Sequence, residues 1–191
     1  IILSVEKDEL GISAGLQDRV IQVYQGLVYM DFDRRYMEEH GHGKYEEIDH
    51  NLLPPLYIAY RADLSEGSEI VHNDLRYRFE KNDPEVISAI SFWADLAKRV
   101  RDALLVGKKD EIPPLLNANF DRRREICKIS DGNLRMVMTA RKAGASAKFT
   151  GSGGAIVGTY NDEEQFEKLC AELDKIGVKT FRPVVAQPIK D

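Results

Sequence analysis

The chain has 191 residues, of which 43% are hydrophobic, and this is enough for the core of one large domain or of two small ones. Its formal net charge of −5 disfavours nucleic acid or an acidic membrane surface as a partner. No apolar run approaches the roughly 18 residues of a membrane span, and no segment resembles a signal peptide. Cys127 and Cys170 form no CxxC pattern, which favours a reduced, cytoplasmic protein.

The first part of the chain predicts a short helix and two strands. A loop of Gly, Ser and Ala leads into a helix at about 18–24, and the alternating segment "GLVYMDF" predicts a strand at 26–32. A polar connection then leads to a second strand, "PLYIAYR", at 55–61. We expect the first 60 residues to expose apolar surface, with Leu3, Val20 and Val28 among the exposed side chains.

The remainder predicts helices beside an antiparallel sheet. Asp83 and Pro84 form a good N-cap and first-turn pair. Apolar residues follow at helical spacing, namely Val86, Ile90, Trp93, Ala97, Val100 and Leu104. Further helices are expected at about 110–126, 133–143 and 162–176, and a capping box of Asp162 and Gln165 opens the last of them. Strands are expected on both sides of a glycine-rich turn and at the end of the chain, in "VKTFRPVVA". The fold class predicted is α+β.

Asp18 stands behind two glycines and before the apolar run of the first helix. The N-terminus of a helix carries partial positive charge and unpaired N–H groups, so a carboxylate is favoured there. One interpretation is an acid that stabilises its own helix by a few tenths of a kcal/mol, roughly. The other is a carboxylate that is kept ionised so that it can accept a proton. On this stretch alone, the first interpretation is favoured.

The segment "KFTGSGGA" holds the most distinctive group of residues, which are Thr150, Gly151, Ser152, Gly153 and Gly154. Glycines let the backbone approach an anion closely, and successive N–H groups in such a turn form a concave nest for phosphate. The alternative, favoured for an isolated GxGG, is a turn that only reverses the chain. No Gly-Lys-Ser/Thr follows, so this is not a Walker A loop.

Two further clusters are more ambiguous. His40, His42 and His50 could hold a metal ion, but H-x-H in a charged loop fixes no third ligand, so a solvated loop is favoured. The arginines at 122–124 end a helix and are interpreted as a solvated face, with a clamp on a carboxylate or phosphate as the alternative.

The order and spacing of these motifs resemble those of the GHMP small-molecule kinases. The pattern G-x-x-A-G-x-x-D precedes an apolar helix and "GLVYMDF", and "GASAKFTGSGGAIV" follows far downstream. The likeness extends over the whole chain, including "LLPPLYIAY" and "LLNANFDRRREI". Within the family, the sequence of this segment most resembles the kinases of glucuronic acid, and it is also similar to the heptose kinases of the same branch.

The resemblance implies a two-domain fold. Residues 1–70 would complete the α/β N-terminal domain, and residues 71–191 would form a ferredoxin-like α+β C-terminal domain. The implied activity is ATP-dependent phosphorylation of the anomeric hydroxyl of glucuronic acid. The alternatives are another sugar kinase of heptose or galactose type, and a non-catalytic relative that senses a sugar.

The resemblance also assigns roles to individual residues. Asp18 matches the base that deprotonates the attacking sugar hydroxyl, and Ala14, Gly15, Gln17 and Arg19 lie on its substrate side. Arg19 is a candidate to bind the carboxylate of a uronic acid, although the next helical position points about 100° away from Asp18. The turn at 150–154 matches the family's third motif, which lies near the phosphates of ATP.

The family's first motif, a Gly/Ser-rich loop around the ATP phosphates, is expected before Ile1, together with the ligands of Mg²⁺. The chain opens at "IILSVEKDELG" without a Met, and we expect it to be the C-terminal portion of a longer kinase that cannot bind ATP productively by itself. Its expected partners are therefore ATP, a sugar acid and the N-terminal part of the same protein, with no nucleic acid and no membrane.

Overall fold

The computed structural model describes residues 15–65 and 68–186. The chain divides into two compact units, which are considered separately below. The first holds the described residues up to Leu52 and those from Val184 onward, and the second is Leu53–Pro183. No helix in the described ranges combines the length and the apolar character that crossing a membrane requires.

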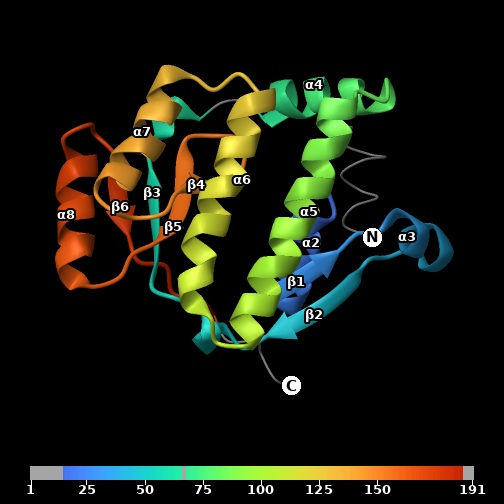
Figure 1. Cartoon of the computed structure of the whole chain (residues 1–191), viewed down its shortest axis with the longest axis horizontal. Helices are drawn as coiled ribbons and strands as arrows, with labels where there is room; N and C mark the ends of the chain where they lie inside the picture. Colours follow the sequence, from blue (N-terminus) through green and yellow to red (C-terminus); the bar gives the residue numbers. More distant parts are fainter. Residues whose placement is uncertain (1–14, 66–67, 187–191) are drawn as a thin grey trace. The chain divides into compact units, whose positions relative to one another are not determined.

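The first unit is built around an antiparallel pair of strands (Figure 1). Its elements are α2 (Gln17–Tyr24), β1 (Leu27–Asp31), α3 (Arg34–His40), β2 (Lys44–Ile48) and the short 3-10 helix η2 (His50–Leu52). Leu27 lies opposite Ile48, and Asp31 lies opposite Lys44. The helix and the strand predicted at 18–24 and 26–32 are therefore confirmed.

The polar connection predicted after residue 32 is wrong, because it contains α3 and β2. The Asp33 carboxylate accepts a hydrogen bond from the Tyr36 N–H at 2.9 Å and thereby caps α3, and Gly41 ends it at a φ of +74°. Three of the five residues of β2 are charged, so hydrophobic alternation is weak there. The segment is a strand because it pairs with β1.

The expected exposure of apolar residues in this unit is only partly correct. Val20 is 7% exposed and therefore buried, contrary to the expectation. Val28 has intermediate exposure, and Leu3 lies outside the described residues.

The second unit contains a four-stranded antiparallel sheet with the order β4-β5-β3-β6. The strands are β3 (Leu56–Tyr60), β4 (Lys148–Phe149), β5 (Ala155–Thr159) and β6 (Lys179–Phe181). Helices separate β3 from β4 and β5 from β6, whereas β4 and β5 are joined by the glycine turn. This is the ferredoxin-like arrangement that the family resemblance implies. The strand β3, expected in the first domain, pairs here with β5 and β6 of the second unit.

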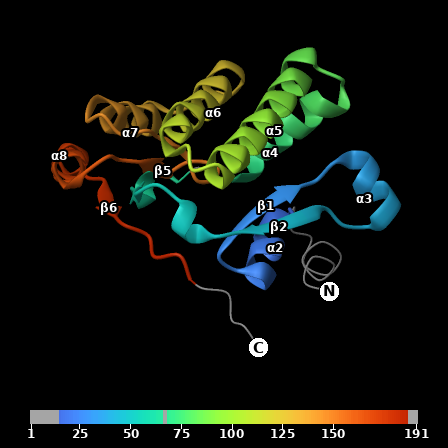
Figure 2. The same cartoon turned by 60° about the horizontal axis from the view of Figure 1, so that its bottom comes forward.

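The helices of this unit are α4 (Ser68–Glu80), α5 (Pro84–Leu105), α6 (Ile112–Ile126), α7 (Asp131–Lys142) and α8 (Glu163–Asp174), with 3-10 turns η3 (Ala62–Leu64) and η4 (Lys109–Glu111). Figure 2 shows α6 and α7 on the same side of β5. The predicted caps are confirmed. The Asp83 carboxylate accepts from the Glu85 N–H, and Asp162 accepts from the Gln165 N–H, both at 2.9 Å.

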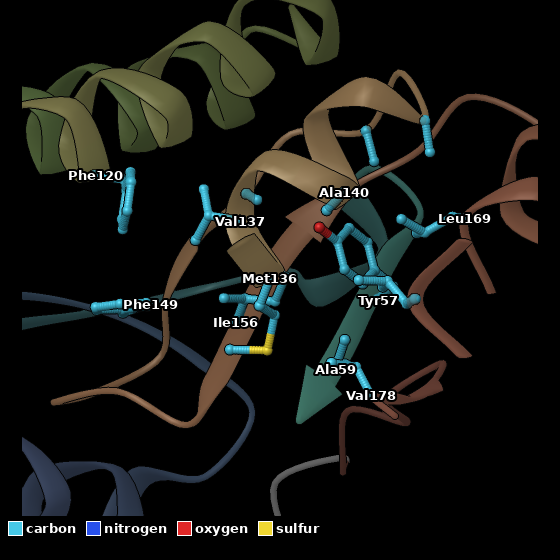
Figure 3. Packing of buried hydrophobic residues seen from close by; sticks show 14 residues of the cluster. Tyr57, Ala59, Phe120, Met136, Val137, Ala140, Phe149, Ile156, Leu169 and Val178 are labelled. Carbon is cyan, nitrogen blue, oxygen red and sulfur yellow. The ribbon is translucent and has the colours of Figure 1, made fainter. Parts of the chain in front are cut away.

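The core of the second unit lies between the sheet and α6, α7 and α8 (Figure 3). Tyr57 of β3, Phe120 of α6, Met136 of α7 and Leu169 of α8 are all fully buried. The Tyr57 hydroxyl donates to the carbonyl of Ser146 at 2.7 Å, so its polar end is satisfied, and burial raises the pKa of Tyr57. The core thus fixes the sheet relative to the helices that border the glycine turn.

The stripe predicted for α5 is only partly correct. Val86 and Leu104 are buried as expected, but Ile90 is 43% exposed, and Ala89 and Leu96 are buried instead. In the middle of the helix the buried stripe runs one position earlier than predicted, with Ala89 and Leu96 in place of Ile90 and Ala97, and Ala97 is exposed.

Candidate active site

Asp18 lies in the first turn of α2, as its sequence context predicts. Its side chain is 78% exposed, so solvent and a ligand can both reach the carboxylate. The helix begins at Gln17, and Leu16 at its N-cap provides no side-chain hydrogen bond. Asp18 is the acidic residue of this first turn, where it complements the partial positive charge of the helix N-terminus.

Arg19 reaches the carboxylate of its neighbour. Its Nη1 lies 3.3 Å from Oδ2 of Asp18 and donates also to the carbonyl of Gly15 at 3.3 Å. The Arg19 side chain is only 19% exposed, and its long stem brings the guanidinium back to Asp18 although the two residues start about 100° apart on the helix. Gly15 and Gln17 are exposed beside this pair. Ala14, the remaining candidate on the substrate side, lies outside the described residues.

The glycine turn belongs to the second unit and joins β4 to β5. Gly154 is buried and has a φ of +75°. A Cβ at this position would lie 2.8 Å from the Cα and 2.9 Å from the N of Ser65, so only glycine fits without a shift of the backbone. A Cβ at Gly151, by contrast, would meet no atom within 4 Å.

Two side chains from different helices hold the turn. Arg123 of α6 donates to the carbonyls of Gly151 at 2.8 Å and of Ser152 at 3.2 Å. Asn133 of α7 accepts from the N–H of Gly154 at 2.8 Å through Oδ1. The Asn133 amide group also donates to the carbonyl of Leu64 at 3.1 Å, which connects the turn to the segment after β3.

Only part of this arrangement can be predicted from residue types and spacing. Arg123 belongs to a run of three arginines that favours a solvated face, and its contact with the turn contradicts that interpretation for this residue. Asn133 is 1% exposed, and a buried amide must find hydrogen-bond partners. Its one local signal is Ser130, three residues earlier, whose hydroxyl it contacts at 3.0 Å.

Lys148 adds a second cation next to the turn. Its side chain is partly buried, and its ammonium group donates to the carbonyl of Phe149 at 2.7 Å. Burial lowers the pKa of Lys148, and the nearby charge of Arg123 lowers it further. The Arg123 guanidinium lies over the ring of Phe149, 5.1 Å from its centroid. The turn is therefore bordered by two positive charges, which suits a phosphate site.

The other arginines of the cluster have separate contacts. Arg122 donates to Glu125 at 2.6 Å and to the hydroxyl of Ser88 at 3.3 Å, which links α6 to α5. Arg124 is exposed. The three residues thus have three different surroundings, and the structure does not bring them together as one clamp.

Two of the three histidines, His40 and His42, lie in an aromatic group of the first unit. His40 stacks on Tyr36 with ring centroids 4.0 Å apart, and Nδ1 of His42 lies 2.8 Å from the carbonyl of Gly43. Across residues 15–65 and 68–186, no group of three His, Cys, Asp or Glu side chains could hold a metal ion. The interpretation of His40, His42 and His50 as a metal site therefore receives no support from their geometry.

Comparison with known proteins identifies relatives along nearly the whole chain. It is 43% identical over 192 residues to glucuronokinase 1 of Arabidopsis thaliana, covering 98% of the chain and 52% of that protein. It is 48% identical over 162 residues to a probable glucuronokinase 2 of the same plant, covering 82% of the chain and 43% of that protein. The chain spans about half the length of these relatives. No family model matches it.

Solved structures agree on the fold. Galactokinase from Lactococcus lactis, complexed with galactose, superimposes with a TM-score of 0.67 at 15% identity, covering 95% of the chain and 57% of that protein. L. major mevalonate kinase, in complex with R-mevalonate, gives a TM-score of 0.63 at 20% identity, covering 78% of the chain and 48% of that protein. At these identities the likeness concerns the fold.

Proposed function

We propose that this chain, which is homologous to glucuronokinases and has the fold of GHMP kinases, is the C-terminal portion of an ATP-dependent sugar-1-kinase. The substrate proposed is glucuronic acid, phosphorylated on its anomeric hydroxyl. The observation that carries the proposal is the position of Asp18, an accessible carboxylate in the first turn of α2, in a chain with this homology.

Asp18 is proposed to act as the general base. Its carboxylate accepts the proton of the anomeric hydroxyl, and the resulting oxygen attacks the γ-phosphorus of ATP. The bond from the γ-phosphorus to the bridging oxygen of ADP breaks, so the products are the sugar 1-phosphate and ADP. Arg19 is proposed to bind the carboxylate of the sugar acid or to hold Asp18, and its contact with the Asp18 carboxylate at 3.3 Å supports a role beside the base.

The glycine turn is proposed to receive the phosphates. Its backbone N–H groups and the two nearby cations, Arg123 and Lys148, suit the negative charge of a phosphoryl group. Bound Mg²⁺ would neutralise part of that charge, and we expect its ligands in the part of the protein before Ile1. Phosphoryl transfer depends mainly on positioning and electrostatics, which is what this turn can supply.

The test is a product analysis with the complete protein. It is incubated with ATP, Mg²⁺ and glucuronic acid, and phosphorus NMR follows the appearance of a sugar 1-phosphate and ADP. Galactose, glucose and a heptose are tried in parallel under the same conditions. A clear preference for glucuronic acid supports the proposal. A preference for a neutral sugar overturns the substrate, and binding of a sugar without any turnover indicates a sensor instead of a kinase.

A further inference from the structure

The first unit contains a cavity that the proposed function does not use. Its volume is about 400 Å³, and small-molecule sites occupy roughly 300–1,000 Å³. Residues of α2, of α3 and of the start of β2 line it (Figure 1). The described lining residues are Tyr24, Tyr36, His42, Gly43, Lys44 and Tyr45. The cavity therefore combines aromatic rings that carry polar groups with one lysine.

The aromatic rings of the cavity pack against one another edge to face. The ring centroids of Tyr24 and Tyr45 are 5.5 Å apart, and those of Tyr36 and His42 are 6.0 Å apart. A tyrosine combines an apolar ring with a hydroxyl that can both donate and accept a hydrogen bond. Within residues 15–65 and 68–186, the hydroxyls of Tyr24 and Tyr36 have no hydrogen-bond partner, so both are available to a ligand.

The backbone at Gly43 gives this cavity a preformed side. The Gly43 N–H donates to the hydroxyl of Tyr45 at 3.0 Å, and its carbonyl lies 2.8 Å from Nδ1 of His42. A Cβ at Gly43 would lie 2.7 Å from the carbonyl oxygen of Asp31, so the chain is packed closely against the end of β1. These contacts hold His42 and Tyr45 in place before a ligand binds, which lowers the entropic cost of binding.

Lys44 contributes a positive charge to the cavity. It lies opposite Asp31 in the pairing of β1 with β2, and opposite residues of a strand pair can interact. The Asp31 carboxylate instead accepts from the N–H of Asp33 at 3.0 Å, and the Lys44 Nζ lies 4.4 Å from the centroid of the Tyr36 ring. In the described part of the chain Lys44 forms no ion pair. Since the ring contacts only one side of the ammonium group, N–H donors remain for an anion.

We propose that this cavity is a second binding site, which takes a sugar acid, meaning a monosaccharide with one carboxylate. The Lys44 ammonium binds the carboxylate, and the hydroxyls of Tyr24 and Tyr36 bind hydroxyl groups of the sugar. The aromatic rings pack against the apolar face of the sugar ring. One ammonium group balances one carboxylate, whereas the phosphates of a nucleotide carry several negative charges.

This site is separate from the one proposed at Asp18. Asp18 lies in the first turn of α2 and Tyr24 is its last residue, so six residues, or about 9 Å along the helix axis, lie between them. The inference goes beyond the proposed function, because binding in this cavity requires neither ATP nor phosphoryl transfer.

The first experiment is a titration of the isotope-labelled complete protein without ATP. Glucuronic acid, glucose and acetate are added separately, and amide signals of Tyr36, Lys44 and Tyr45 report the cavity, while that of Asp18 reports the other site. We expect saturable shifts at the cavity with glucuronic acid, and an affinity about 10-fold lower for glucose and for acetate. No shift at the cavity, or an equal affinity for glucose or for acetate, would overturn the inference.

The second experiment repeats the titration with variants. K44Q should bind glucuronic acid about 10-fold more weakly at the cavity and bind glucose unchanged, because only the charge is lost. Y36F keeps the ring and loses the hydroxyl, so it should weaken the binding of both sugars by about 3-fold. The matched control is K128Q, which removes an exposed lysine of the second unit and should change neither affinity. Wild-type affinities in both K44Q and Y36F contradict the site.

The cavity and the kinase assignment fail separately. A protein that phosphorylates glucuronic acid but shows no shift at Tyr36, Lys44 and Tyr45 contradicts the second site and leaves the proposed function intact. Saturable shifts at these residues in a protein without turnover support the second site and contradict the kinase assignment.

Discussion

The side-chain amide of Asn133 binds the N–H of Gly154 and the carbonyl of Leu64 at the same time, at 2.8 Å and 3.1 Å. One buried residue of α7 thereby connects the end of the glycine turn to the segment that follows β3. Because these groups are withdrawn from water, each hydrogen bond lost would leave a polar group without a partner.

Replacing Asn133 by alanine should therefore destabilise the protein. We expect N133A to lower the free energy of unfolding by about 1–3 kcal/mol, since the buried N–H of Gly154 loses its acceptor. Urea unfolding of the complete protein measures this change. N161A serves as the control, because the side chain of Asn161 is exposed. An equal midpoint for N133A and N161A would contradict the structural role of Asn133.

The turn offers a second matched pair of substitutions. G154A places a methyl group within 3 Å of the backbone of Ser65 and forces alanine into a left-handed conformation. We expect a loss of roughly 2–5 kcal/mol, from about 1–2 for the conformation and about 1–3 for overpacking. G151A meets nothing within 4 Å, so its stability should stay within about 0.5 kcal/mol of the wild type. Thermal and urea unfolding compare the two, and similar losses would refute this account of the turn.

The lowered pKa of Lys148 predicts how the free energy of unfolding depends on pH. Its folded-state pKa lies below the ordinary value of 10.5, mainly through burial and further through Arg123, so the folded protein binds fewer protons than the unfolded chain between those two values. The free energy of unfolding must then rise with pH in the interval just below 10.5. This rise should be smaller in K148M than in the wild type. Parallel slopes for the two proteins over that interval would show that Lys148 titrates normally.

Much of the fold follows from local signals in the sequence. Asp83 with Pro84 and Asp162 with Gln165 mark helix starts through contacts within one turn, so they can be recognised without any tertiary information. The strand β2 cannot, because its charged residues carry little hydrophobic periodicity and its structure depends on pairing with β1. The existence of helices is therefore more predictable than the full set of strands.

The candidate site divides in the same way. The glycines of the turn and Asp18 can be selected from residue type and spacing, because Gly154 needs a backbone conformation that favours glycine and the first turn of a helix favours an acid. The contacts of Arg123 and Asn133 join residues 28 and 21 positions apart in the chain, and no local pattern indicates them. Side chains that hold a site from neighbouring helices become visible only when the helices are packed.

Asp18 is expected to matter for turnover and little for folding. The side chain is 78% exposed, so D18N should cost no more than about 1 kcal/mol from the lost interaction with the helix N-terminus. If Asp18 is the base, kcat should fall by about 10²-fold or more, with a much smaller change in the KM for the sugar. Steady-state kinetics of the complete protein measure both constants. Turnover equal to that of the wild type would reduce Asp18 to a helix-stabilising acid.

Arg19 permits a test of how the sugar carboxylate is recognised. A uronic acid needs a cation that can form two parallel hydrogen bonds, and the Arg19 guanidinium lies next to the proposed base, 3.3 Å from its carboxylate. R19Q should therefore lower kcat/KM for glucuronic acid more strongly than for the neutral sugar of the same ring. A loss of one bidentate contact corresponds to about 10-fold to 10²-fold in this ratio. Equal losses on both sugars would assign Arg19 to the orientation of Asp18, and the reader of the carboxylate would then be sought elsewhere in the complete protein.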